Sequence, residues 1–365
     1  MQPGIDVFGF FNTASGLGEA GRLLATALRA VEYPVVCLPV SSPAAQNDHA
    51  FDVSNEWKHD KVLFAVNSLE LTHIVRQLDA RRLSNKYGYI IGQWFWELEY
   101  FPPSMHMGYR YVNEVWAATD FICKTLSQHA PKQVKVQTMP LPLVAPQFDP
   151  EISKVDIGVD PRRFMFYYTF SYFSVNGRKN PEAVIKAFKK AFKNEEGPIL
   201  VIKTVYGRHF SQMLDRLQAL IGDRTDIKLI NSTLDALTAN ALLNIADCYV
   251  SLHRAEGLGL TISESMAFGK PVIATNYSGN TDFMTDDTSI LIPWEYSEVG
   301  PGNDVYPPTA KWAEPDTNAA AEAMKYVYNN QNKAKLMGQR AKKHLETNFS
   351  LEKTGKRMAE YLDSL

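Results

Sequence analysis

Short apolar runs alternate with helix-periodic segments along most of this chain. The apolar runs at residues 5–11, 34–40 and 61–66 are nearly continuous, which is typical of parallel strands buried on both faces. The segments between them place apolar residues three or four positions apart, as one buried face of a helix requires. Strands that alternate with helices predict an α/β fold built on parallel sheets.

Two blocks of this alternation follow one another. The first is expected to hold strands at residues 5–11, 34–40, 61–66, 87–92, 114–119 and 134–142, with helices at 23–31, 69–83 and 121–129. The second is expected to hold strands at 164–170, 198–203, 227–230, 249–252, 271–274 and 289–293, with helices at 182–192, 212–220, 234–245, 318–329, 333–348 and 350–363. Residues 144–163 are rich in turn residues and are typical of a linker. We therefore expect a first domain at 1–155 and a second at 160–345, with an irregular loop at 294–315.

The turn after the strand at 249–252 contains the largest concentration of candidate ligand-binding residues. Glu256 and Glu264 stand eight positions apart, with Gly257 and Gly259 between them and a short helix behind. Ligands of α/β sheets bind where such loops leave the carboxyl ends of strands. Glycines let backbone approach a ligand, a helix N-terminus offers N–H groups to an anion, and carboxylates accept hydrogen bonds from hydroxyls. The loop is therefore suited to a sugar nucleotide.

The same stretch also allows a purely structural interpretation. Thr261 and Glu264 satisfy the spacing of a capping box, in which Glu264 reaches back to the helix start. Gly269 would then end the helix and Pro271 would stop it. This interpretation leaves Glu256 and the glycine pair without a role.

A second anion-binding loop is predicted at the start of the second block. Arg178 and Lys179 directly precede Asn180 and Pro181, a pair typical of a helix N-cap and the first helical position. A forked guanidinium and a point-charge ammonium at a helix start both suit a diphosphate. Exposed cations on a turn are the alternative.

Glycines also follow the first strand of the chain. Gly16, Gly18 and Gly21 satisfy the spacing G-x-G-x-x-G. A dinucleotide site also needs an acidic residue after the second strand, where residues 41–43 are Ser-Ser-Pro. The motif therefore gives little support to a nicotinamide-dependent dehydrogenase. The simpler prediction is that Gly16 and Gly18 let a loop of the first domain approach a phosphate.

Aromatic and acidic residues crowd the end of the strand at 87–92. Gln93, Trp94, Trp96 and Glu97 follow it directly, and Asp120 follows the next strand. Because aromatic faces stack on the apolar faces of sugars, this region is a candidate sugar-binding platform. Core packing of Trp94 and Trp96 is the alternative.

Composition narrows the class of protein further. The 365 residues are 45% hydrophobic and 21% charged, and a net charge of −2 gives no reason to expect nucleic-acid binding. Three scattered cysteines and the lack of an H-E-x-x-H pair argue against a disulfide framework and a metal centre. With no secretion signal and no apolar run of membrane-spanning length, a cytoplasmic protein is expected. The basic residues Arg76, Arg81, Arg82 and Lys86 suggest peripheral contact with the inner membrane face, a solvated helix face being the alternative.

The run from Glu256 to Ala274 resembles the retaining glycosyltransferases of family 4. The residues that carry the resemblance are the E-x7-E pair, Glu256 and Glu264, and the following Ala-x-Gly-x-Pro-Val-Ile-Ala at 267–274. It extends over residues 178–188, the glycine loop at 15–18 and the segment after Phe349. It implies the GT-B architecture, in which two Rossmann-like domains face each other across a cleft. The C-terminal helix, here 350–365, would cross back to the first domain.

The resemblance also implies a role for each motif residue. Glu256 would hold hydroxyls of the donor sugar at its reacting face, and Glu264 would hold the ribose. The donor would further be bound by residues of three loops, namely Lys179 with Arg178, the backbone of Gly257, Leu258, Gly259 and Leu260, and the loop at Gly16 and Gly18. Glu256, Lys179 and Arg178 are the catalytic candidates.

Two positions depart from the family pattern. Phe173 stands where the family usually has an arginine, and Arg178 is its expected substitute. The family also has a histidine where this chain has the segment 93–97. The candidates for contact with the sugar or the acceptor are therefore Gln93, Trp94, Trp96, Glu97 and Asp120.

The implied reaction is transfer of a hexosyl group, with retention, from a nucleotide-diphospho-sugar to a hydroxyl of a saccharide or glycolipid, as in polysaccharide biosynthesis. A UDP-glucose-type donor is favoured by its frequency in the family, with GDP-mannose next. Attack on the front face of the sugar would need no metal or other cofactor. A nucleotide-sugar epimerase of similar two-domain fold and a non-catalytic nucleotide-sugar-binding protein are the alternatives.

Overall fold

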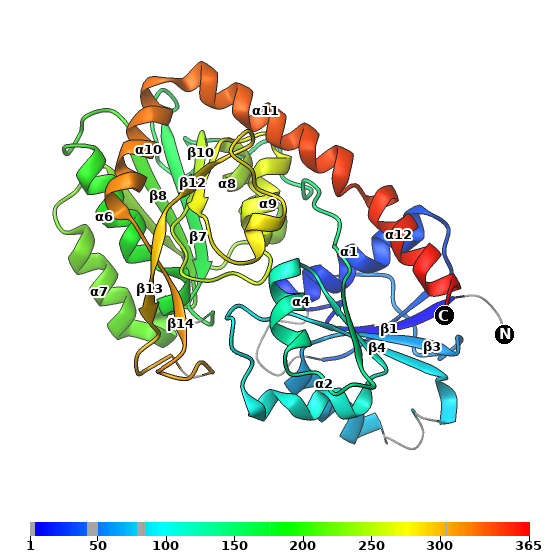
Figure 1. The fold of residues 1–365 in the computed structure, drawn as a ribbon. Coiled ribbons are helices and arrows are strands. Elements are labelled where there is room, and N and C mark those ends of the chain that lie inside the picture. Colours follow the sequence, from blue (N-terminus) through cyan, green and yellow to red (C-terminus); the bar gives the residue numbers. More distant parts are fainter. Residues whose placement is uncertain (1–3, 42–49, 79–82, 84, 175, 304) are drawn as a thin grey trace. The chain divides into compact units, whose positions relative to one another are not determined.

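A computed structural model describes residues 4–41, 50–78, 83, 85–174, 176–303 and 305–365. The chain divides into unit 1, residues 1–143 with 348–365, and unit 2, residues 144–347. Each unit has its own six-stranded parallel sheet covered by helices (Figure 1), which confirms the predicted α/β class and the two Rossmann-like domains. Within the described residues, every helix is too short or too polar to span a bilayer.

The sheet of unit 1 has the strand order β2-β1-β3-β4-β5-β6, and all its strands run parallel. Its strands are β1 (Ile5–Gly9), β2 (Val35–Pro39), β3 (Lys61–Ala65), β4 (Tyr89–Trp94), β5 (Glu114–Ala117) and β6 (Lys135–Thr138). Its helices are α1 (Gly16–Ala30), α2 (Ser68–Leu78), η1 (Pro103–Tyr111), α4 (Asp120–Ser127) and α12 (Leu351–Asp363). Each strand predicted for the first domain is present. Arg81 and Arg82, two of the basic residues for which membrane contact was suggested, lie outside the described residues.

The C-terminal helix α12 belongs to unit 1 and packs along α1 (Figure 1). The two helices approach so closely at Gly355 that a β-carbon there would lie 2.0 Å from the carbonyl oxygen of Ala27. Tyr361 Oη also donates a hydrogen bond to the buried carboxylate of Glu114 at 2.8 Å. The predicted return of the C-terminal helix to the first domain is therefore confirmed.

The sheet of unit 2 has the strand order β12-β11-β10-β7-β8-β9. Its strands are β7 (Met165–Ser171), β8 (Ile199–Val205), β9 (Ile227–Asn231), β10 (Cys248–Ser251), β11 (Val272–Thr275) and β12 (Ile290–Ile292). Its helices are α5 (Asn176–Lys179), α6 (Pro181–Ala191), η2 (Gly207–Phe210), α7 (Ser211–Ile221), α8 (Ala236–Ile245), α9 (Leu260–Ala267), η3 (Gly279–Asp282), α10 (Thr317–Asn329) and α11 (Gln331–Asn348). Helices α6, α7 and α10 cover one face of the sheet and α8 and α9 the other (Figure 1). The strand order reverses between β7 and β10, at the switch point where α/β folds bind ligands.

The first helix begins earlier than its apolar pattern predicted. Helix α1 starts at Gly16, because the N-cap Ser15 accepts a hydrogen bond from the N–H of Gly18 at 3.1 Å. The glycines at 16, 18 and 21 therefore lie in the first turns of the helix. The prediction of a glycine loop before a helix at 23 was wrong.

Residues 294–315 form a hairpin where an irregular loop was predicted. Strand β13 (Trp294–Glu298) pairs antiparallel with β14 (Lys311–Pro315). The prolines and glycines that suggested irregular structure mostly lie in the connection at 299–310, outside the paired strands. The pairing joins residues up to 21 positions apart, from Trp294 to Pro315, so a short sequence window misses it.

Residues 144–155 lie with unit 2 rather than with the first domain. The Asp149 N–H donates to the carbonyl of Leu237 at 3.2 Å, and Lys154 Nζ donates to Asp247 at 2.5 Å. These contacts with α8 and with the start of β10 hold the segment on unit 2, so the boundary falls after residue 143.

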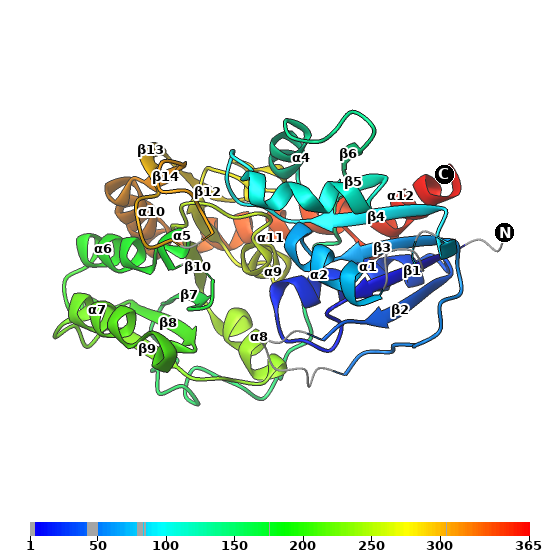
Figure 2. The same cartoon turned by 90° about the horizontal axis from the view of Figure 1, so that it is seen from below.

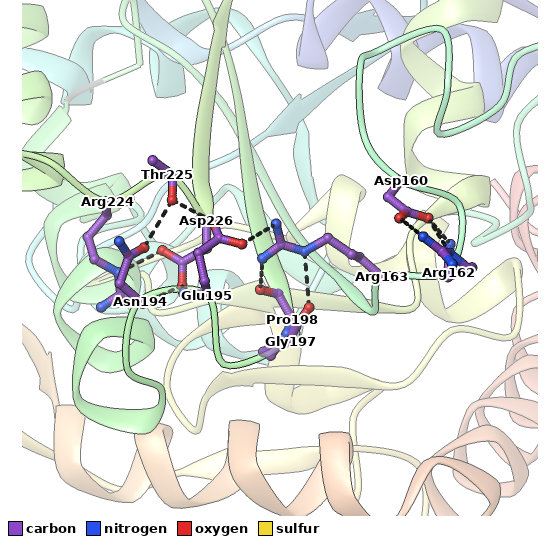
Figure 3. Close-up of polar contacts among 10 residues, drawn as sticks. All are labelled: Asp160, Arg162, Arg163, Asn194, Glu195, Gly197, Pro198, Arg224, Thr225 and Asp226. Atoms are coloured by element: carbon purple, nitrogen blue, oxygen red, sulfur yellow. Dashed lines mark hydrogen bonds and ion pairs between the residues drawn. The ribbon is translucent and has the colours of Figure 1, made fainter.

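A network of charged side chains joins the segments that enter the strands β7, β8 and β9 (Figure 3). Arg224 makes a bidentate contact with the fully buried Asp226, with both N–O distances at 2.6 Å. Arg163 donates to the carbonyls of Gly197 and Pro198 at 3.0 and 2.8 Å. Because these residues precede the strands, the network lies at the edge of the sheet opposite the carboxyl ends. Its contacts stabilise the starts of the strands. The candidate site lies at the opposite edge of the sheet, where the carboxyl ends of the strands are.

Candidate active site

The loops after β7 and β10 bring three charged candidates together. Lys179 Nζ donates to Glu256 Oε1 at 2.5 Å, and Arg178 Nη1 donates to Glu256 Oε2 at 2.9 Å. Arg178 and Glu256 are each 7% exposed. Both loops leave carboxyl ends of strands next to the switch point, which is why residues so distant in sequence meet. We call Arg178, Lys179 and Glu256 the charged trio.

This environment keeps Glu256 ionised. Burial by itself would raise the pKa of the carboxyl, but Lys179 and Arg178 outweigh burial and hold the pKa at about 2. Two cations around one carboxylate leave an excess positive charge within the trio. Such a site suits a ligand that carries both an anionic group and hydroxyls.

The loop after β11 positions the backbone of Glu256. Ser278 Oγ accepts from the Glu256 N–H at 2.8 Å, and the Gly279 N–H donates to the Glu256 carbonyl at 2.9 Å. A β-carbon at Gly279 would lie 1.9 Å from the carbonyl oxygen of Gly257, so this approach requires glycine. The main chain of the predicted motif is therefore fixed by a loop that the motif does not include.

His253 is a buried residue that the sequence did not single out. Its Nδ1 lies 3.0 Å from Ser251 Oγ, and its Nε2 lies 3.1 Å from Asn280 Oδ1. Burial lowers the pKa of the imidazole, so the ring is neutral at pH 7. His253 thus links the end of β10 to the loop after β11. A single histidine without a recognisable motif does not predict such a structural role.

Arg254 was also missed. Its Nη1 donates to the carbonyl of Gly177 in α5 at 2.7 Å, and its Nε donates to Glu314 Oε2 at 2.5 Å. Its guanidinium lies 5.3 Å from the centre of the Trp312 ring. Arg254 therefore ties the short helix of the two cations to the hairpin β13–β14. Because that hairpin was predicted to be irregular, no pattern indicated this contact.

Helix α9 begins directly after the glycines of the loop. Gly259 is its N-cap, with φ of 88°, and a glycine has no side chain with which to cap the helix start at Leu260. Thr261 lies inside the helix, where its Oγ1 accepts from Tyr249 Oη at 2.9 Å, so the capping-box interpretation was wrong. Gly269 follows the helix with φ of 75°, as predicted for its end. A helix start that follows glycines presents backbone N–H groups, and anions bind at such positions.

The remaining motif residues flank this helix start. Gly257 and Leu258 are buried in the loop, and Glu264 is half-buried in the second turn of α9. Glu264 stands four residues after Leu260 and therefore shares its side of the helix. The predicted contact of Glu264 with a ribose stays a prediction.

In unit 1, Gly16 and Gly18 have different surroundings. No heavy atom lies within 4 Å of a β-carbon added at Gly16. A β-carbon at Gly18 would lie 2.4 Å from the carbonyl oxygen of Thr13 and 2.7 Å from that of Phe10, and the Gly18 N–H already bonds to Ser15. Gly18 is therefore needed for the packing of α1 on its own entry loop. Only the surroundings of Gly16 are open to a ligand.

The predicted aromatic platform is part of the core of unit 1. Trp94 is 1% exposed and packs on Tyr109 with ring centres 4.8 Å apart. Trp96 is 5% exposed and donates Nε1 to the carbonyl of Tyr100 at 2.8 Å, and Gln93 is fully buried. Strand β4 continues through Trp94 with helices on both faces, which buries these side chains. The prediction that Trp94 and Trp96 form a sugar platform was wrong.

The two acidic candidates of unit 1 lie nearer the surface. Glu97 is half-buried three residues after β4, and Asp120 is exposed in the first turn of α4, where Oδ1 accepts from Thr138 Oγ1 at 2.5 Å. Both follow carboxyl ends of parallel strands and stay candidates for contact with the acceptor. In the described ranges, no group of three or more His, Cys, Asp or Glu side chains is placed to hold a metal ion.

Part of the second unit is similar to a known family. Residues 165–297, which include the charged trio and Glu264, match the family described as Glycosyl transferases group 1. Trehalose synthase of Pyrococcus horikoshii is 28% identical over 148 residues, covering 40% of this chain and 30% of that protein. This chain therefore matches less than a third of the length of that relative.

Solved structures resemble the whole chain. The complex of Anabaena Alr3699/HepE with UDP and glucose has a TM-score of 0.70 at 14% identity and covers 100% of both chains. Sucrose-phosphate synthase of Thermosynechococcus elongatus has a TM-score of 0.69 at 14% identity, covering 100% of this chain and 99% of that one. At such identity the likeness establishes the fold alone. Residues 165–297 of unit 2 therefore match the family of Glycosyl transferases group 1, and the chain as a whole has the two-unit, Rossmann-like GT-B fold of these solved structures.

Proposed function

We propose that this chain transfers a hexosyl group from a nucleotide-diphospho-sugar of the UDP-glucose type to a hydroxyl of a saccharide or glycolipid. The observation that carries the proposal is the charged trio, which lies after the carboxyl ends of β7 and β10, with Glu256 in the loop that leads into α9. The family match over the same residues supports glycosyl transfer. The UDP and glucose in the Alr3699/HepE complex support the choice of donor.

In this proposal the cations and the carboxylate have different tasks. Lys179 and Arg178 bind the diphosphate and stabilise the negative charge that grows on it as the glycosidic bond breaks. Glu256 accepts hydrogen bonds from hydroxyls of the donor sugar. Its low pKa makes it a weak base, which favours positioning over proton abstraction. Glu264 accepts from the ribose.

The proposed mechanism is retaining, as in family 4. The acceptor oxygen bonds to the anomeric carbon on the face that the diphosphate leaves, while the bond from that carbon to the diphosphate oxygen breaks. The acceptor proton passes to the leaving diphosphate. The residues orient both substrates and stabilise the leaving charge, so the proposal needs no metal or other cofactor.

A donor panel tests the proposal. The full chain is incubated with UDP-glucose, UDP-galactose, UDP-N-acetylglucosamine or GDP-mannose, and nucleotide release is measured, with Glu256→Gln as the matched inactive control. We expect release from one donor and, from an α-linked donor, an α-linked product by NMR. A β-linked product contradicts retention. Interconversion of free nucleotide sugars, or binding without any turnover, contradicts transfer.

We further propose a cytoplasmic protein that meets its acceptor at the inner face of the membrane. The support is the basic sequence of Arg76, Arg81, Arg82 and Lys86, of which Arg76 lies in the last turn of helix α2. Flotation with phosphatidylglycerol vesicles and with phosphatidylcholine vesicles tests this. Binding to the anionic vesicles alone is expected, and failure to bind either contradicts it.

A further inference from the structure

The two faces of the sheet in unit 2 are covered by different helices. Figure 2 shows β7 and β8 between α6 and α7 on one side and α8 and α9 on the other. On β7, Phe166 packs against Phe188 of α6, with ring centres 6.1 Å apart. Tyr167 instead packs against Tyr249, whose hydroxyl bonds to Thr261 of α9. Because alternate side chains of a strand point to opposite faces, the odd-numbered residues of β7 lie on the side of α8 and α9.

That side of the sheet is partly uncovered at the carboxyl ends of β7 and β8. Although β7 is an interior strand, Thr169 and Ser171 are only half-buried, whereas Phe170 on the α6 side is buried. The parallel partners of Thr169 and Ser171 in β8 are Lys203 and Val205, which share their face. Val205 is half-buried as well. We call Thr169, Ser171, Lys203 and Val205 the β7–β8 patch.

The β7–β8 patch contains a buried cation. Lys203 is 8% exposed, and its ammonium makes no hydrogen bond or ion pair with the described residues. Its Nζ is not fully enclosed, so the stem is buried while the charged end reaches the surface of the patch. Burial lowers the pKa of this ammonium to about 8, and no carboxylate of the described residues offsets the effect. Because an unpaired buried charge is costly and lysine is almost never buried unless paired, Lys203 is a candidate ligand-binding residue.

The position of Lys203 relative to the charged trio indicates which ligand it meets. In the proposed function, the trio binds the diphosphate after β7 and β10, and Glu264 accepts from the ribose. Helix α9, which carries Glu264, covers the same face of the sheet on which Lys203 lies. The nucleoside end of the donor therefore extends over this face, and the base is the part that lies beyond the ribose.

The chemistry of the β7–β8 patch suits a base that carries a carbonyl group. Lys203 is its charged member, Thr169 and Ser171 are neutral, and Val205 is apolar. A phosphate would be expected to meet several cations or forked donors, whereas a carbonyl oxygen needs one donor. An amino group in the same place would oppose a donor to the ammonium. Uracil and guanine carry a carbonyl where cytosine and adenine carry an amino group.

We propose that Lys203 determines the base preference of this chain by donating a hydrogen bond to O4 of uracil. The base lies over the β7–β8 patch, beyond the ribose that Glu264 holds. This inference rests on the proposed function, because the binding of the donor at the charged trio brings its base to Lys203. The same contact to O6 of guanine would favour GDP-linked over ADP-linked donors.

The first test is isothermal titration calorimetry on the full chain with two matched pairs of nucleotides, UDP with CDP and GDP with ADP. The test variant is Lys203→Met, which keeps an apolar stem and removes the charge. The control is Lys186→Ala in α6, whose side chain is 52% exposed. Melting temperatures without nucleotide show whether each variant is folded.

We expect the unmodified chain to bind UDP at least about tenfold more tightly than CDP, since a hydrogen bond to a charged group contributes that much. Lys203→Met should bind UDP about tenfold more weakly and CDP as before, whereas Lys186→Ala keeps the preference. If the donor is guanosine-linked, the same loss appears in the pair of GDP and ADP. Lys203→Met should melt at an equal or higher temperature, because it removes an unpaired buried charge.

Acetylation of lysines at pH 8, followed by mass spectrometry, gives a second readout. Lys203 should be acetylated in the free chain, because its pKa of about 8 leaves a large share of the amine unprotonated. UDP should protect Lys203 from acetylation, and inorganic pyrophosphate should not. The exposed Lys186 should be acetylated equally under all three conditions.

Several results would overturn the proposal. Protection of Lys203 by pyrophosphate would mean that it binds phosphate and not the base. Equal base preference in Lys203→Met and the unmodified chain, or no preference within either pair, would also contradict it. Turnover of a donor together with either result would contradict this inference alone. The expected base preference without turnover of any donor would support this inference and contradict the proposed function alone.

Discussion

Lys179 Nζ lies 2.5 Å from Glu256 Oε1, although the two residues are 77 positions apart in the chain. Lys179 ends α5, whose last carbonyl accepts from Tyr168 Oη at 2.5 Å, and Glu256 follows β10. The pair therefore spans the switch point between the two halves of the sheet of unit 2. The contact places a cation and a hydroxyl acceptor within reach of one ligand.

Removing the Lys179 ammonium should remove stabilisation of the leaving diphosphate. We expect Lys179→Ala to lower the turnover of the preferred donor about 100- to 1,000-fold, as loss of one preorganised donor does elsewhere. The control is Lys186→Ala in α6, whose side chain is 52% exposed, and which should keep full activity. Initial rates of nucleotide release measure both. Equal activity of the two variants would contradict the assigned role of Lys179.

Glu256 should make stability depend on pH in the acid range. Its pKa falls from the usual 4.5 to about 2 on folding, so the ionised carboxylate stabilises the fold above about pH 4.5. This contribution is lost as the pH falls from about 4.5 towards 2, where the folded carboxyl takes up its proton. The Glu256→Gln variant lacks this carboxylate, and so it lacks the stabilising contribution at every pH. The stability gap between the two proteins should therefore be constant from pH 8 to pH 5 and shrink below.

Urea unfolding of both proteins at pH 7, 5, 4 and 3 measures this gap. A gap that stayed constant down to pH 3 would show that the cations do not lower the pKa of Glu256. At pH 7 we expect Glu256→Gln to be less stable by about 3 kcal/mol, because it leaves two cations around a neutral amide.

Gly16 and Gly18 form a matched pair in the first turn of α1. Gly18→Ala should destabilise unit 1 by about 1–3 kcal/mol, because its β-carbon would meet the carbonyl oxygens of Thr13 and Phe10. Gly16→Ala, which has open space, should change stability by less than about 0.5 kcal/mol. Thermal unfolding without nucleotide compares them. Equal melting temperatures would mean that Gly18 is not required for packing.

Gly355 should be essential for the attachment of α12. A β-carbon 2.0 Å from the Ala27 carbonyl oxygen forces the two helices apart, so Gly355→Ala should cost about 3 kcal/mol. Hydrogen exchange should show faster exchange in α12 and α1. Gly88→Ala, with no atom within 4 Å of its β-carbon, is the control in the same unit. Unchanged protection of α12 in Gly355→Ala would refute the close packing.

The alternation of strands and helices, the two Rossmann-like units and the residues of the charged trio could all be predicted from the amino-acid sequence. These features depend on residues that are adjacent in the sequence. Apolar runs of strand length specify buried parallel strands, and glycines and charges after a strand specify a loop at its carboxyl end. Arg178, Lys179 and Glu256 were found because each lies in the short segment that follows the carboxyl end of a strand.

The contacts that hold these loops, and the side chains that stay exposed, depend on how distant segments pack in the folded chain. Arg254 bonds to Glu314 through the pairing of β13 with β14, and Gly18 packs on the carbonyls of its own entry loop. Trp94 is buried because β4 is an interior strand of its sheet, which its neighbours in sequence do not reveal. These three cases have one cause. Burial and hydrogen bonding at these positions depend on partners brought in by other segments, whereas apolar period and turn chemistry depend on adjacent residues alone.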